Sequence, residues 1–146
     1  MKRSRMLLVT LLLGSTQVGC FSRDAEVPID WSASIPLGTE RAAPGQPLLV
    51  YFTAPWCRIC DRMDQESFST AAVMNALERF VPVKINVDEQ PKTADAYFAH
   101  AVPAYFVFDS AGEIRARATG FLNSEELSDY LVKSSDLLAA EQTSDD

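Results

Sequence analysis

The sequence predicts a single-domain α/β fold, and two observations carry this prediction. Residues 48–53 (LLVYFT) form a continuous apolar run of strand length, as expected for a strand that is buried on both faces of a sheet. The residues after this run alternate between helix-like and strand-like patterns up to residue 138, without an internal repeat. Removal of an N-terminal signal leaves about 125 residues, which is enough for one hydrophobic core and too few for two domains.

Residues 1–19 have the pattern of an export signal. Lys2, Arg3 and Arg5 form a basic start, the apolar residues 6–13 follow, and small or polar residues lead up to position 19. The apolar run is too short for a helix across a bilayer, which needs about 20 residues. We therefore expect residues 1–19 to direct export and then to be removed.

The end of this signal, residues 17–20 (QVGC), resembles the lipobox of bacterial lipoproteins. The glycine and Cys20 fit that motif, whereas Gln17 stands where leucine is usual. The resemblance implies a lipid on Cys20, and hence a membrane anchor on the exported, periplasmic side; ordinary signal cleavage nearby is the alternative. Lipidation would also leave Cys57 and Cys60 as an even pair, because an odd thiol in an exported protein invites mispairing.

Prolines and glycines interrupt residues 20–46, which we therefore interpret as a tether followed by an N-terminal edge segment. We expect residues 29–31 and Ile35 to form a short edge strand, and residues 38–43 to form at most two turns of helix. Trp31 is expected to cover the core.

Two cysteines follow the first strand, in the segment WCRIC (residues 56–60). We expect Cys57 to lie in the first turn of a helix, where unpaired N–H groups and the helix dipole favour a thiolate. Arg58 adds a cation nearby. Cys60 lies one turn further on and can close a disulfide with Cys57, so the pair can cycle between dithiol and disulfide.

Two other interpretations of this pair remain. A tetrahedral zinc site would need about two more cysteine or histidine ligands. The chain offers only Cys20 and His100, so we expect no metal. An inert structural disulfide is the other alternative, although structural bridges usually close longer loops, where the entropic gain is larger.

Periodicity predicts the elements that follow. A helix through Met63 is expected to break at Phe68. The later elements are expected in this order: a helix over 70–80, a strand over 81–87, a short helix over 93–99, a strand over 104–108, a turn over 109–112 and its hairpin partner over 113–118.

The last helix is predicted from its cap. Asn123 followed by Glu126 is typical of a capping box. We expect four apolar side chains of this helix to face inward: Leu127, Tyr130, Leu131 and Leu137. Residues 139–146 are polar and acidic, and we expect a frayed tail there.

The charge of the chain argues against nucleic-acid binding. Loss of the three basic residues of the signal takes the formal charge from −7 to −10. No basic stripe remains to meet phosphates. We expect the acidic surface to maintain solubility and to bias which partners bind.

Residues 47–138 resemble the thioredoxin superfamily. WCRIC matches the active-site motif, Val102-Pro103 matches the cis-proline loop, residues 83–88 (VKINVD) match the third strand, and Gly120-Phe121 matches the glycine region before the last helix. The resemblance implies the thioredoxin fold, a central mixed β-sheet flanked by helices. Within the superfamily, the segments ESFS (66–69) and TGF (119–121) are most similar to the C-terminal periplasmic domain of the disulfide reductase DsbD and to related thioredoxin-like lipoproteins.

This resemblance implies roles for the site residues. Cys57 would attack a substrate disulfide as the thiolate, and Cys60 would then resolve the mixed disulfide. Pro103 would be cis, so that Val102 offers backbone groups to an extended substrate. Trp56 would present a flat contact surface. No cofactor is implied.

Proton handling departs from the thioredoxin pattern. Thioredoxins have a buried aspartate six residues before the first cysteine, and here that residue is Tyr51. Lys84 matches the lysine that commonly pairs with this aspartate. Asp64 lies four residues after Cys60 on the same helix face and matches an acidic position of the DsbD-like domains, so we hypothesise that it acts as the base for Cys60. The alternative is a solvated surface aspartate.

The functional prediction is an exported thiol–disulfide oxidoreductase that reduces disulfides of exported proteins. The expected partners are protein disulfides or thiols and a membrane electron donor of the DsbD type. Two alternatives remain, namely a thioredoxin-fold binding module for exported clients and a thiol reductant for cytochrome c maturation. His100, three residues before Pro103, is expected to be a solvated histidine at a helix end.

Overall fold

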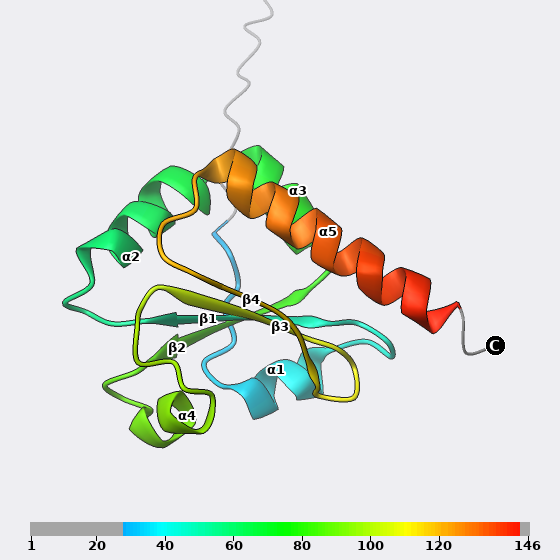
Figure 1. Cartoon of the computed structure of the whole chain (residues 1–146), viewed down its shortest axis with the longest axis horizontal. Helices are drawn as coiled ribbons and strands as arrows, with labels where there is room; N and C mark the ends of the chain where they lie inside the picture. The colour runs from blue at the N-terminus through cyan, green and yellow to red at the C-terminus, as the bar shows by residue number, and fades with distance from the viewer. Residues whose placement is uncertain (1–27, 144–146) are drawn as a thin grey trace, which may run out of the picture.

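The computed structural model describes residues 28–143. The predicted signal, Cys20 and the first part of the predicted tether lie outside these residues. The elements, shown in Figure 1, are α1 (Ile35–Arg41), β1 (Leu48–Thr53), α2 (Arg58–Arg62), the π-helix η1 (Met63–Ser67), α3 (Ala71–Leu77), β2 (Val81–Asn86), α4 (Pro91–Ala96), β3 (Ala104–Phe108), β4 (Ile114–Thr119) and α5 (Ser124–Gln142). Within this part of the chain, no helix has both the length and the apolar character needed to cross a bilayer.

The four strands form one mixed sheet in the order β2-β1-β3-β4. β1 pairs with β2 in parallel, from Leu48 opposite Val81 to Thr53 opposite Asn86. The pairs β1–β3 and β3–β4 are antiparallel. The central mixed sheet expected from the sequence is therefore confirmed. β1 is apolar from Leu48 to Phe52 because strands flank it on both sides and helices cover both faces.

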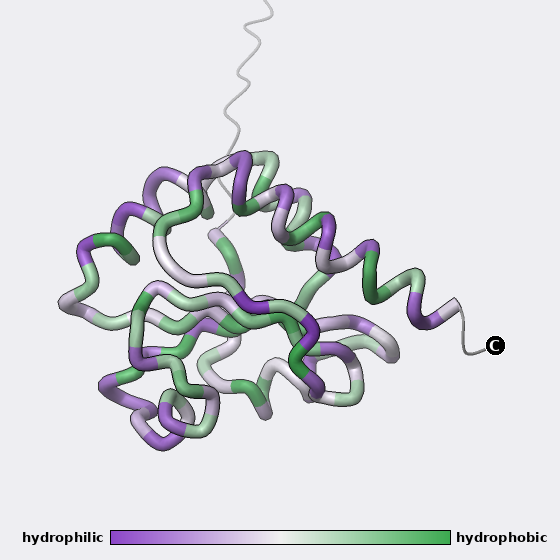
Figure 2. The backbone as a smooth tube through the Cα atoms, viewed as in Figure 1, coloured by the Kyte–Doolittle hydropathy of each residue, from purple (hydrophilic) through white to green (hydrophobic). Residues whose placement is uncertain are grey.

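Side chains of the sheet alternate between two cores. Leu49 and Tyr51 point into the core beneath α2, η1, α3 and α5, whereas Val50 and Phe52 point into the core that α1 and α4 cover. Figure 1 shows α2, α3 and α5 on one side of the sheet and α1 and α4 on the other. Hydrophobic residues recur along the strands, and hydrophilic and hydrophobic residues alternate along α5 (Figure 2).

The prediction of an N-terminal edge strand over residues 29–31 and Ile35 is largely wrong. Only Ser32 makes a β-bridge, to Val83 of β2. Ile35 opens helix α1 instead, because Ser34 caps that helix and Pro36 fits its first turn. Gly38 allows α1 to approach the sheet, since a Cβ there would lie 2.4 Å from Cγ2 of Val83.

The helix after the first strand differs in detail from the prediction. It continues from α2 into a π-helical turn, in which the amide of Phe68 donates to the carbonyl of Met63 at 2.9 Å. α3 begins at Ala71 and ends at Leu77, inside the predicted range of 70–80. α4 is shifted from the predicted 93–99 to Pro91–Ala96, because proline is favoured at the first helical position.

The last helix starts as predicted and ends later. The capping box of Asn123 and Glu126 is present. Leu127 and Leu131 are buried as expected and Tyr130 packs partly against the core, but Leu137 is 65% exposed and its neighbour Leu138 is buried instead. The prediction for Leu137 was wrong because Leu138, seven residues after Leu131, continues the inward stripe.

The helix also extends beyond Leu138, where we expected a frayed tail. It runs to Gln142, whose side-chain amide donates to the carbonyl of Gly45 at 3.3 Å. Glu141 pairs with Arg115 of β4. These two contacts hold the last turn against the rest of the domain.

Candidate active site

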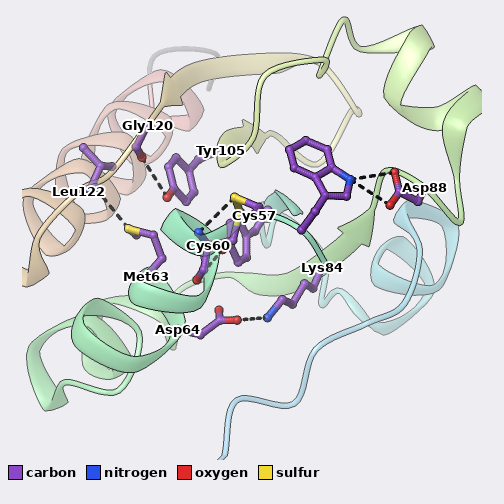
Figure 3. The surroundings of a disulfide bond; sticks show 11 residues. Cys57, Cys60, Met63, Asp64, Lys84, Asp88, Tyr105, Gly120 and Leu122 are labelled. Carbon is purple, nitrogen blue, oxygen red and sulfur yellow. Dashed lines mark hydrogen bonds and ion pairs between the residues drawn. A yellow bond between two sulfur atoms is a disulfide. The ribbon is translucent and has the colours of Figure 1, made fainter. Parts of the chain in front are cut away.

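Cys57 and Cys60 form a disulfide at the start of α2, and both residues are buried. Cys57 is the N-cap of this helix rather than part of its first turn, and its Sγ accepts a hydrogen bond from the amide of Cys60 at 3.1 Å. Figure 3 shows the Cys57–Cys60 disulfide at the centre of the site. After reduction, the same amide and the helix dipole would stabilise a thiolate on Cys57.

Trp56 is 64% exposed beside the disulfide. Its indole Nε1 donates to both carboxylate oxygens of Asp88, at 3.1 and 3.3 Å. Asp88 lies in the connection between β2 and α4. Sequence reasoning placed Trp56 at the site but missed Asp88, because a contact across 32 residues leaves no local signal.

The Val102–Pro103 peptide is cis, as the resemblance implied. Val102 packs against the core cluster that contains both cysteines. The carbonyl of Pro103 accepts a hydrogen bond from the amide of Gly120 at 2.9 Å, and Gly120 has φ +86°, a left-handed conformation that suits glycine. The structure thus connects the proline loop both to the core cluster that contains the cysteines and to the glycine region.

Tyr51 and Tyr105 lie beneath the disulfide. The hydroxyl of Tyr51 donates to the backbone carbonyl of Cys60 at 3.3 Å, and the hydroxyl of Tyr105 donates to the carbonyl of Gly120 at 3.2 Å. Burial raises the pKa of both phenols well above the usual value of 10.0, with Asp64 adding to the shift, so both remain neutral at physiological pH. Tyr105 was not identified from the sequence, since its position within an apolar run is that of an ordinary strand residue.

Asp64 and Lys84 form an ion pair of 2.6 Å, about one turn beyond Cys60. The Lys84 ammonium also lies 5.3 Å from the ring centroid of Tyr51 and 5.6 Å from that of Trp31. Both members of the pair remain partly solvent-accessible, and they line an open groove together with Trp31. Tyr51, Asp64 and Lys84, which the sequence suggested separately, are thus neighbours, as Figure 3 shows for the ion pair.

The π-helix fixes the cysteine-bearing helix to the loop before α5. The Sδ of Met63 accepts a hydrogen bond from the amide of Leu122 at 3.3 Å, and the hydroxyl of Ser67 donates to the carbonyl of the same residue at 2.6 Å. Arg62 lies 4.3 Å from the ring centroid of Phe121. A π-helical turn holds one residue more than an α-helical turn. The side chains of Met63 and Ser67, at the two ends of this turn, both form hydrogen bonds to the backbone of Leu122.

His100 lies apart from this chemistry. It is an exposed residue, with its Nδ1 3.8 Å from a carboxylate oxygen of Asp95. Residues 28–143 contain no group of three or more histidine, cysteine or acidic side chains that could hold a metal ion.

The comparison with known families agrees with this geometry. The profile of a thioredoxin-like domain matches residues 39–135. The chain belongs to this family. A CxxC disulfide at the start of a helix in this fold is the centre of a thiol–disulfide oxidoreductase.

Similar proteins carry related names. The chain is 27% identical over 86 residues to the thiol:disulfide interchange protein DsbD of Campylobacter jejuni (strain RM1221). The aligned region covers 56% of this chain and 15% of that protein. It is 32% identical over 103 residues to DsbD of Pectobacterium atrosepticum, covering 66% of this chain and 18% of the relative. The chain thus spans less than a fifth of the length of these relatives.

Solved structures show the same fold. The oxidised C-terminal domain of Neisseria meningitidis DsbD superposes with a TM-score of 0.55 at 22% identity, covering 61% of this chain and 80% of that one. A mutant thioredoxin from Halobacterium salinarum gives a TM-score of 0.57 at 22% identity, covering 72% of this chain and 88% of that one.

Proposed function

We propose that this thiol–disulfide oxidoreductase is exported and reduces disulfides of exported proteins. The observation that carries the proposal is the Cys57–Cys60 disulfide at the start of α2, with Val102 of the cis-proline loop packed against the cluster that holds both cysteines. The reduced pair would donate two electrons and two protons to a substrate disulfide and return to the disulfide seen here.

The first step is attack by Cys57 as the thiolate. Its sulfur forms a bond to one substrate sulfur, and the other substrate sulfur leaves as a thiolate that takes up a proton. The amide of Cys60, which already donates to the sulfur of Cys57, supports the attacking charge. Arg58 is the next residue and adds a positive charge.

The second step is attack by Cys60 on Cys57, which releases the reduced substrate. Cys60 must first lose its proton, and Tyr51, a neutral phenol, cannot accept it. We assign this role to Asp64, one turn away on the same helix and partly open to solvent. The ammonium of Lys84 holds the Asp64 carboxylate in place through their ion pair.

Substrates and location follow from the same proposal. An extended substrate segment would pair with the backbone of Val102 and cover the exposed face of Trp56. Electrons would come from a membrane donor of the DsbD type, since the relatives named above are thiol:disulfide interchange proteins. Export through residues 1–19 and a lipid on Cys20 would place the domain on the periplasmic side of a membrane.

The reduction potential of the Cys57–Cys60 couple tests the proposal. We would measure it by thiol labelling of the full chain with Cys20→Ser in defined glutathione buffers. A reductase requires a value near that of thioredoxin, about −270 mV, whereas a value near that of DsbA, about −120 mV, would indicate an oxidant and contradict the proposed direction.

A double variant separates the enzyme from a binding module. In the Cys57→Ser/Cys60→Ser chain, an enzyme loses all disulfide reduction. A binding module would retain its function in this variant.

A further inference from the structure

Phe98 has an unusual backbone conformation for an aromatic residue. It follows α4 with φ +55°, in the left-handed region that bulky side chains rarely adopt. The amide of Phe98 donates to the carbonyl of Asp95 at 3.1 Å, and the amide of Ala99 donates to the carbonyl of Ala94 at 2.9 Å. This pattern is a Schellman motif, in which the position of Phe98 usually carries glycine.

The phenyl ring does not compensate for this strain by packing inside the domain. Phe98 is 79% exposed, the highest exposure among the large hydrophobic side chains of residues 28–143. Its neighbours behave differently, since Tyr97 packs against the core below α4 and Ala99 is buried. The fold therefore gives Phe98 no role that glycine would not fill better.

Phe98 lies close to the cis-proline loop along the chain. Val102 lies four positions after Phe98, so their Cα atoms are at most about 14 Å apart. In the connection that precedes α4, Asp88 accepts a hydrogen bond from the indole of the exposed Trp56. Figure 1 shows α4 at the end of the sheet where β1 leads into α2.

We propose that Phe98 is a second apolar contact for polypeptide substrates, beyond the contacts at Trp56 and Val102. This inference rests on the proposed reductase function and specifies its substrate class. The substrate is an extended polypeptide with an apolar side chain several residues from its disulfide-bonded cysteine. An extended segment advances about 3.3 Å per residue, so roughly four or five residues are enough to cover a span of at most about 14 Å between Val102 and Phe98.

The test uses two peptides that differ only where Phe98 would contact them. Each peptide has one cysteine, which forms a mixed disulfide with glutathione. The first peptide has leucine about five residues before and after this cysteine, and the second peptide has serine at the same positions. We would measure the rate at which the pre-reduced full chain with Cys20→Ser loses its thiols to each peptide and to glutathione disulfide. The variants are Phe98→Gly and Phe98→Tyr, and Leu137→Ser is the control because it removes another exposed apolar side chain, from α5.

We expect the unaltered chain and the Leu137→Ser variant to react roughly tenfold faster with the leucine peptide than with the serine peptide. A factor of this size is typical of one apolar side chain that becomes buried in an interface. Phe98→Gly should abolish this preference, and Phe98→Tyr should keep most of it. The glycine variant should unfold at the same temperature or higher, because glycine relieves the left-handed strain.

Three outcomes would overturn the inference. Phe98→Gly could keep the leucine preference, it could lower the unfolding temperature as a packed residue would, or it could convert a dimer into a monomer in sedimentation, which would assign the surface to a second copy of this chain. If the unaltered chain reacted with none of the three disulfides, the proposed function itself would fail, and the inference with it.

Discussion

The ring of Tyr51 stacks on that of Tyr105, with centroids 5.3 Å apart and planes 11° from parallel. One hydroxyl reaches the carbonyl of Cys60 and the other reaches the carbonyl of Gly120. Where thioredoxins have a buried carboxylate, this site therefore has a neutral, hydrogen-bonded aromatic pair. The replacement of a buried carboxylate by this tyrosine pair has consequences both for the stability of the domain and for its catalysis.

Tyr51→Phe should change how stability depends on alkaline pH. The pKa of Tyr51 is raised in the folded state, so the unfolded chain loses this proton first, near pH 10, and stability falls as pH rises above that value. Each such tyrosine contributes about 1.4 kcal/mol per pH unit to this fall. Urea unfolding between about pH 9 and 11 should show a shallower decline for the variant. Parallel curves for the two proteins would show that Tyr51 does not remain neutral in the folded state.

Asp64→Asn should slow the release of mixed disulfides. Loss of a general base lowers the rate by on the order of 10²-fold, and the remaining rate should rise with pH as hydroxide takes over. Release can be followed by stopped-flow after trapping a substrate on Cys57. Asp61→Asn is the matched control, because Asp61 lies on the same helix and lines the same groove without bonding Lys84. An unchanged pH profile for Asp64→Asn would remove this residue from the mechanism.

Ser67→Ala should destabilise the domain by about 1–2 kcal/mol, because the Leu122 carbonyl loses the hydroxyl that donates to it at 2.6 Å. The free energy of unfolding in urea measures this loss. Ser69→Ala is the control, since its hydroxyl bonds only to the exposed turn at Gln65. Equal effects of the two substitutions would show that the bond between η1 and the loop contributes little.

Leu138→Ala and Leu137→Ala should differ sharply. Leu138 is buried, so its truncation should cost about 2–4 kcal/mol of unfolding free energy, whereas the exposed Leu137 should cost less than about 0.5 kcal/mol. Thermal or urea unfolding distinguishes the two. A larger loss at Leu137 would contradict the observed register of α5.

Features that depend on local pattern could be predicted from the sequence. β1 could be predicted because a strand buried on both faces is largely apolar. The disulfide pair followed from the spacing of two cysteines after that strand, although Cys57 is the N-cap of α2 and not part of its first turn. The cap of α5 at Asn123 was equally local. The choice between Leu137 and Leu138 was not, because two adjacent leucines satisfy the helical period almost equally and packing against the core decides between them.

The missed parts of the site are tertiary contacts. Trp56 forms a hydrogen bond with Asp88, and Met63 forms one with Leu122, which lies 59 residues further along the chain. No local pattern marks such partners, since each is an ordinary residue in its own segment. The resemblance to thioredoxins identified the segments that meet, and the structure identified the side chains that connect them.

Tyr51 and Tyr105 are also directly opposite each other in the ladder between β1 and β3. A slip of that ladder by one residue would place the two phenols on opposite faces of the sheet, so that one of them would lose its bond to the carbonyl of Cys60 or of Gly120. Correct registration of two strands and assembly of the redox centre are therefore a single event. A chain that pairs these strands wrongly would lack one of these two bonds beneath the disulfide, so we expect active protein to have the correct register.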